Sequence, residues 1–116
     1  MTTKEFYRLL PPAIQSILLT SEGWLVGGAV DTILKGEVPE DFDIIVPDIN
    51  KYNLTIKQIH SYDPVIEINS YGGLKITADD GATLDIWPEE LGHFLISANQ
   101  VGHIYNHKRQ ILIKKV

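Results

Sequence analysis

GWLVGGAVDTILKGEVPEDFDIIV, residues 23–46, contains two short apolar runs joined by a glycine pair and an amphipathic segment. Residues 24–26 are three large apolar residues bounded by glycine on both sides, which predicts a short buried strand. The glycine pair after them predicts a turn. From Ala29 the apolar positions recur at helical spacing, and Gly36 is a common type of helix stop, so a short helix should follow the turn.

The predicted turn consists of Gly27 and Gly28. Glycines allow positive φ angles and let another group approach the backbone closely. The first N–H groups of the helix have no partner within the helix and carry the positive end of its dipole. A strand, a glycine turn and a helix start together favour a phosphate site. A plain tight turn is the alternative, and for the glycine pair alone it is the more common one.

An acidic pair, Asp41 and Asp43, opens the second apolar run, which Pro47 ends. Side chains alternate faces along a strand, so these two carboxylates should share a face, with Phe42 on the other. Carboxylates on one face repel each other and gain little as structure. Mg²⁺ relieves such repulsion and usually takes one or two carboxylates plus substrate phosphates. A solvated acidic loop end is the alternative.

A third carboxylate, Asp85, stands alone inside the apolar strand predicted over residues 82–87. A buried charge is costly unless it is paired or coordinates a metal. The alternative is a surface-facing residue on a half-exposed sheet. The Asp-Gly pair at 80–81 predicts a hairpin that joins this strand to one over residues 74–77.

The remaining segments are predicted from periodicity and from breaker residues. Pro11-Pro12 should interrupt the first helical pattern. The expected elements are a helix over residues 3–19 with this break, a helix over 52–59, a strand over 65–68, a helix over 88–98, a polar loop over 102–110 and a strand over 111–116.

Histidines and cations gather near the C-terminus. His93, His103 and His107 would make a zinc set, but no carboxylate motif accompanies them, so solvated loop histidines are the better explanation. The stretch YNHKR, residues 105–109, is a better candidate for an anion or phosphate contact. A solvated loop is again the alternative.

Length and composition predict one domain, residues 1–116, with a modest core. The absence of cysteine excludes disulfides and cysteine-based metal sites. A formal net charge of −5 argues against non-specific nucleic-acid binding, yet it is compatible with a metal–nucleotide substrate. Charged residues interrupt the N-terminal apolar positions and no stretch reaches membrane-span length, so we expect a cytoplasmic protein that does not contact membranes.

The stretch GGAVDTILKGEVPEDFDIIV, together with LDIWP around Asp85, resembles the nucleotidyltransferase head domain of CCA-adding tRNA nucleotidyltransferases and bacterial poly(A) polymerases. More broadly, it resembles the DNA polymerase β-like superfamily. Those enzymes combine a glycine turn and helix with an acidic pair on the next strand and a third Asp on a later strand. The resemblance covers roughly residues 23–88. The family usually continues with Arg-Asp after the Val of its glycine motif, whereas here Val30 precedes Asp31-Thr32.

The resemblance implies an α+β nucleotidyltransferase fold, a short mixed sheet with helices on one face and the carboxylates along one edge. It implies transfer of a nucleotide from a nucleoside triphosphate such as ATP to a hydroxyl acceptor, with Mg²⁺ or Mn²⁺ and release of pyrophosphate. The implied site residues are Asp41, Asp43 and Asp85 as catalytic metal ligands, and Gly27 and Gly28 for the phosphates. Some other cation must then replace the missing arginine. The candidates are Lys35, Lys75, Lys108 and Arg109, of which we expect Lys35 and Arg109 to bind the nucleotide.

The acceptor stays open between an RNA 3′ end, a protein side chain and a small molecule. The competing interpretation is a non-catalytic module of the same fold, antitoxin-like or partner-binding. Asp31 and the lack of room for RNA-holding domains favour that module. Retention of all three carboxylates favours catalysis, because clustered acids without a use only reduce stability.

Overall fold

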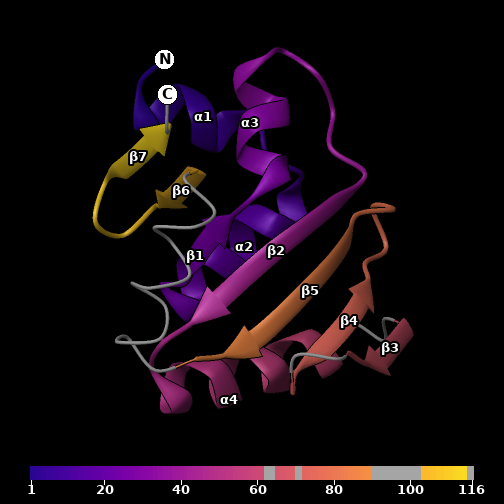
Figure 1. The fold of residues 1–116 in the computed structure, drawn as a ribbon. Helices are drawn as coiled ribbons and strands as arrows, with labels where there is room; N and C mark the ends of the chain where they lie inside the picture. Colours follow the sequence, from indigo (N-terminus) through magenta and orange to yellow (C-terminus); the bar gives the residue numbers. More distant parts are fainter. Residues whose placement is uncertain (62–64, 70–71, 90–102, 115–116) are drawn as a thin grey trace.

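The computed structural model describes residues 1–61, 65–69, 72–89 and 103–114 and builds a seven-stranded sheet with helices on one face (Figure 1). Within these residues, no helix is long and apolar enough to cross a membrane. The helices are α1 (Thr3–Arg8), α2 (Pro12–Ser21), α3 (Gly28–Leu34) and α4 (Ile49–His60). The strands are β1 (Trp24–Val26), β2 (Asp41–Val46), β3 (Val65–Ile68), β4 (Leu74–Thr77), β5 (Thr83–Pro88), β6 (His103–Asn106) and β7 (Ile111–Lys114).

The strand order across the sheet is β3-β4-β5-β2-β1-β6-β7. Strands β2 and β5 run parallel, and the other neighbouring pairs are antiparallel. The predicted mixed sheet is therefore confirmed. The expectation that the three carboxylates lie along an edge is wrong, because the β3–β4 hairpin forms that edge and leaves β5 to pair with β2 inside the sheet.

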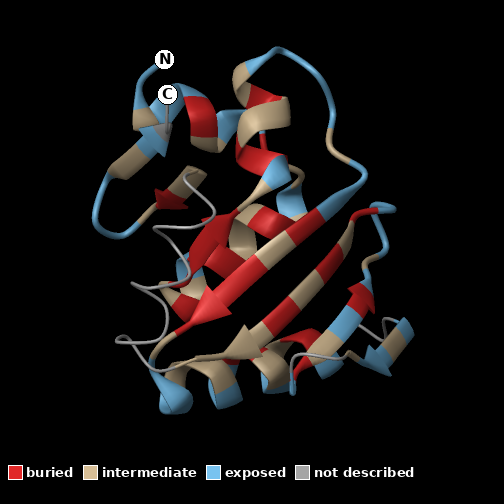
Figure 2. Cartoon of the chain, in the orientation of Figure 1, coloured by how far each residue is buried: buried red, intermediate tan, exposed pale blue. Residues whose placement is uncertain are grey.

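The main core lies between the sheet and the helices. Phe42, Ile44 and Val46 of β2 and Leu84 and Ile86 of β5 belong to this core and occupy alternate positions along their strands. Figure 2 shows the alternating buried and intermediate bands along β5. Each fully buried side chain of this size contributes about 1.5–3 kcal/mol. This alternation leaves the intervening residues of both strands on the opposite face.

The opposite face, called here the carboxylate face, carries Asp43 and Asp85 beside a smaller apolar cluster. Trp24, Val26 and Ile45 form this cluster, with other partly buried apolar side chains packed against it. Helices α1–α4 contribute their buried residues to the main core, on the other side of the sheet (Figure 1). The sheet therefore separates the helices from Asp43 and Asp85.

Local signals explain the helix starts. The Thr2 hydroxyl accepts a hydrogen bond from the Glu5 N–H (3.1 Å), and the Asp48 carboxylate accepts from the N–H groups of Asn50 (2.9 Å) and Lys51 (3.1 Å). Such caps satisfy N–H groups that have no partner within the helix. Pro12 opens α2, as expected of proline at a first helical position. The predicted break between the first two helices is confirmed.

Strand β6 corrects the sequence prediction of a polar loop over residues 102–110, of which only residues 107–110 form a turn. Tyr105 is fully buried opposite Leu25 of β1, and its ring centroid lies 4.5 Å from that of Phe6. Asn106 is also buried, and its side-chain amide is satisfied because it donates to the carbonyls of Glu22 (3.2 Å) and Gly23 (3.3 Å). The polar residues of β6 hid the strand, since their partners lie more than 70 residues away in the sequence. The helix predicted over residues 88–98 lies outside the described residues except at its start, where Pro88 ends β5.

Candidate functional site

Asp43 and Asp85 stand opposite each other on the two parallel central strands. Directly paired residues of neighbouring strands point to the same face, so both carboxylates lie on the carboxylate face. Asp41 precedes Asp43 by two positions and lies on that face at the exposed start of β2. The structure thus brings together the three acids singled out from the sequence.

The electrostatics of this group are unfavourable for its own charges. Burial raises the pKa of the Asp43 carboxyl, and the charges of Asp85 and then Asp41 raise it further. No three His, Cys, Asp or Glu side chains in the described ranges are already arranged to hold a metal ion. The donor chemistry nevertheless fits a hard divalent cation, since Mg²⁺ takes carboxylate oxygens and a nearby positive charge would relieve this repulsion.

We expect the Asp43→Asn variant to become more stable relative to wild type as pH rises above about 4. An aspartate in an unfolded chain has a pKa of about 3.9, and the pKa of Asp43 in the folded protein lies higher. Below the unfolded value Asp43 is protonated in both states, so its full contribution to stability is present. That contribution is lost as pH rises through the folded pKa, because the folded state must then hold a disfavoured charge.

Urea denaturation of both proteins between about pH 3 and pH 7 measures this difference. The Asp79→Asn variant is the matched control, because Asp79 lies exposed in the β4–β5 turn. A stability difference between the Asp43 variant and wild type that stays constant over this range would contradict the assignment of a raised pKa.

Asn69 holds Asp85 in place, and the sequence analysis did not identify it. Its amide group donates to the Asp85 Oδ1 (3.2 Å) and to the Leu74 carbonyl (3.1 Å). Its own Oδ1 accepts from the Gly73 N–H (2.9 Å). Asn69 therefore links the β3–β4 turn to one oxygen of Asp85. The available signal was an Asn at the end of a strand before a Gly-Gly turn, which is a common site for side-chain to backbone hydrogen bonds.

The glycine turn lies beside the acids because Val26, the residue before it, pairs with Asp43. Gly27 adopts φ 79° and ψ −147°, a conformation that favours glycine. Its N–H donates to the His103 carbonyl (3.1 Å), so it extends the β1–β6 pairing. The expectation that both glycine N–H groups face a phosphate therefore needs correction, and Gly28 remains the candidate. A side-chain carbon added at Gly28 would meet no atom within 4 Å.

The Asp31 carboxylate, in the first turn of α3, contacts a lysine and a histidine. One oxygen lies 2.8 Å from Lys35 Nζ and the other lies 3.6 Å from His103 Nε2. The hydrogen bond and charge of Asp31 raise the pKa of Lys35. Lys35, predicted as a nucleotide contact, is thus held by its own helix.

Arg109 lies at the other end of β1 from the glycine turn. Its guanidinium carbon lies 5.7 Å from the centroid of the Trp24 ring, a cation–π arrangement. Trp24 is the first residue of β1 and Gly27 follows the last. The structure does not bring Arg109 together with Lys35 or with the glycine turn.

Two of the histidines expected in a solvated loop, His103 and His107, are partly buried and contact other side chains. His103 belongs to β6 and faces Asp31. His107 stacks on Tyr7 with ring centroids 3.9 Å apart, and its Nδ1 lies 3.0 Å from the Tyr105 hydroxyl. His93 lies outside the described residues.

The sequence matches no protein-family model and no curated protein sequence. The structure is similar to solved CCA-adding enzymes. An apo form has a TM-score of 0.68 at 14% identity, covering 98% of this chain and 32% of that chain. A complex with ATP has a TM-score of 0.68 at 15% identity, covering 99% and 33%. This chain has the nucleotidyltransferase fold. The Thermotoga maritima CCA-adding enzyme complexed with tRNA has a TM-score of 0.53 at 17% identity, covering 76% and 24%.

The nucleotidyltransferase fold of this chain spans about a third of the length of the first two enzymes. At these identities the likeness concerns the fold. Within the nucleotidyltransferase fold, the chain pairs Asp43 with Asp85 and with Val26, which directly precedes the glycine turn. Lys35 contacts Asp31, and Arg109 lies over Trp24.

Proposed function

We propose that this chain is a metal-dependent nucleotidyltransferase that moves a nucleotide from a nucleoside triphosphate to a hydroxyl acceptor. The observation that carries the proposal is the direct pairing of Asp43 with Asp85 on parallel central strands, with the glycine turn one residue beyond the neighbouring strand. The similarity to a CCA-adding enzyme in complex with ATP supports the same assignment at the level of fold.

In the proposed reaction, the acceptor hydroxyl oxygen bonds to the α-phosphorus and the bond from that phosphorus to the bridging oxygen breaks. Pyrophosphate leaves, and the hydroxyl proton passes to a carboxylate or to water. Mg²⁺ or Mn²⁺, when bound, would stabilise charge on the attacking and leaving oxygens. Asp41, Asp43 and Asp85 would hold the cations, and the Gly28 N–H would donate to the departing phosphates.

Asp31 affects how a triphosphate could reach α3. Its carboxylate would repel the triphosphate at the helix start, but the ion pair with Lys35 offsets that charge. Lys35 would therefore act on the nucleotide indirectly, as the counter-ion of Asp31. For Arg109 we propose no contact with the nucleotide, because it lies over Trp24 at the other end of β1.

Three classes of hydroxyl acceptor are candidates, and a labelling experiment distinguishes them. An RNA 3′ end comes first, because one structural neighbour is a CCA-adding enzyme complexed with tRNA. A protein side chain and a small molecule are the other two classes. Incubation of the protein with labelled ATP, CTP, GTP or UTP, Mg²⁺ or Mn²⁺, and pools of each acceptor class would identify the labelled product.

A non-hydrolysable nucleoside triphosphate with Mg²⁺ should raise the melting temperature, because a ligand that binds only the folded state stabilises it. We expect the Asp43→Asn variant to lose this shift, because it removes a carboxylate that binds the cation. Differential scanning fluorimetry measures it, with the Asp79→Asn variant as control. Absence of any shift with all four nucleotides, together with no labelled product, would exclude the enzyme and favour a non-catalytic module of the same fold.

We expect the Asn69→Ala substitution to reduce metal affinity or catalytic activity about 10–100-fold, because losing a hydrogen-bond partner of a metal-binding side chain has an effect of this size. The variant removes the N–H that fixes the Asp85 Oδ1. Mn²⁺ titration of the nucleotide-bound protein measures the change in affinity. A variant with lower stability but unchanged Mn²⁺ affinity would mean that Asn69 only closes the β3–β4 turn.

A further inference from the structure

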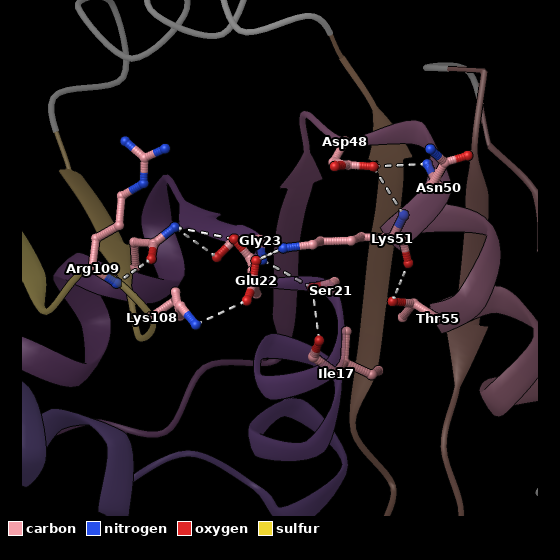
Figure 3. Close-up of polar contacts among 11 residues, drawn as sticks. Ile17, Ser21, Glu22, Gly23, Asp48, Asn50, Lys51, Thr55, Lys108 and Arg109 are labelled. Carbon is pink, nitrogen blue, oxygen red and sulfur yellow. Dashed lines mark hydrogen bonds and ion pairs between the residues drawn. The ribbon is translucent and has the colours of Figure 1, made fainter.

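A polar pocket of about 180 Å³ lies where the end of α2, the start of α4 and the β6–β7 turn meet. Its lining includes Trp24 at the start of β1 and two carboxylates, those of Glu22 and Asp48. Lys51 on α4 and Lys108 and Arg109 in the turn complete its charged lining (Figure 3). The pocket adjoins the start of β1 and the end of β2, whereas the glycine turn and Asp41 lie at the opposite ends of these strands.

Three cations from two distant parts of the sequence line this pocket, Lys51 and the adjacent pair Lys108 and Arg109, although the chain as a whole carries a net charge of −5. The Glu22 carboxylate bridges two of them. Its Oε2 contacts Lys51 Nζ and its Oε1 lies 3.2 Å from Lys108 Nζ. A carboxylate is itself an oxyanion, so this bridge indicates that the two ammonium groups can share one oxyanion.

Glu22 reaches this position through a left-handed backbone conformation, φ 53° and ψ 27°. Glycine is the usual residue there at the end of a helix. The Asn106 amide fixes the backbone by donating to the Glu22 carbonyl. The Glu22 carboxylate is thus held between the lysines at some conformational cost, and it is the group that an incoming anion would have to displace.

Arg109 provides the donor that Glu22 does not use. Its backbone N–H donates to the Asn106 Oδ1 (2.8 Å), which fixes the turn. Its guanidinium lies over the Trp24 ring. Across the described ranges of the chain, no carboxylate forms an ion pair with Arg109. A guanidinium presents a planar fork of N–H groups that matches a phosphate or carboxylate.

We propose that this pocket is an oxyanion site for a single phosphate group, with Arg109, Lys108 and Lys51 as donors and Glu22 as the internal competitor. A volume of about 180 Å³ suits one phosphate with water and lies below the range of roughly 300–1,000 Å³ typical of larger ligands. The phosphate comes either from inorganic phosphate or from the backbone of a nucleic acid. The proposal does not rest on catalysis at Asp43 and Asp85.

The test is titration of inorganic phosphate, followed by NMR of the backbone amides of residues 106–110. The Arg109→Gln variant should bind about tenfold more weakly, because a charge-assisted hydrogen bond contributes an effect of this order. The Glu22→Gln variant should bind several-fold more tightly, because it removes the competing charge. The Lys57→Met variant, which changes an exposed lysine of the same helix α4 outside the pocket, should bind like wild type.

A short single-stranded RNA titrated in parallel identifies the source of the phosphate. Binding to RNA alone, with a steep loss at higher salt and the same order of variants, assigns the site to backbone phosphate. The proposal is overturned if neither phosphate nor RNA binds. It is also overturned if their binding is unchanged by both Arg109→Gln and Lys108→Met. The two turn variants keep the test valid if the Glu22 variant does not fold.

Discussion

Asp85→Asn is expected to reduce nucleotidyl transfer by about a thousandfold or more, the size of effect that follows from losing a group that stabilises transition-state charge. Asparagine keeps the shape of the side chain and removes its charge. The hydrogen bond from Asn69 to Oδ1 can persist in the variant, so the hairpin should keep its geometry. Single-turnover transfer of labelled nucleotide measures the loss, and the exposed Asp79→Asn substitution is the control.

The same variant should be at least as stable as wild type in the absence of metal, because it removes one charge that acts on Asp43. This combination of lost activity and retained stability is typical of residues that serve function at a cost to stability. Chemical denaturation without divalent cations checks it. An Asp85→Asn protein that fails to fold would instead show that Asp85 is mainly a structural acceptor for Asn69.

Gly73→Ala is expected to cost about 3 kcal/mol of unfolding free energy, the upper part of the range for overpacking a close-fitting site. A side-chain carbon at this position would lie 2.1 Å from the Ile86 carbonyl oxygen and 2.6 Å from the Trp87 Cβ. Backbone atoms of β5 cannot move aside cheaply, so β4 would have to separate from β5. Urea denaturation measures the cost.

Gly28→Ala is the matched control for this substitution. The added carbon would meet no atom within 4 Å, so stability should change by less than about 1 kcal/mol. Equal effects of the two substitutions would mean that β4 and β5 are not packed as closely as the Gly73 contacts indicate.

The alternation of residues 41–46 was enough to put Asp41 and Asp43 on one face and Phe42 on the other, because strand geometry is local. Local signals also predicted the glycine turn, the break at Pro11-Pro12 and the β4–β5 hairpin. They failed at residues 103–106, where His and Asn mimic a loop. Those polar groups are satisfied by Asp31 and by the carbonyls of Glu22 and Gly23, which no local pattern contains.

Local sequence patterns predict which residues carry charge, which strand faces they occupy and where most chain turns fall, since these depend on neighbours a few positions apart. Long-range packing is what makes Asp43 face Asp85, Gly27 donate to β6, and Asn69 reach Asp85. It also lets Glu22 bridge Lys51 and Lys108. Each of these depends on which strands become neighbours. That choice is made by burying the apolar faces of β2, β5 and β1 together, and its energy belongs to the whole core rather than to any segment.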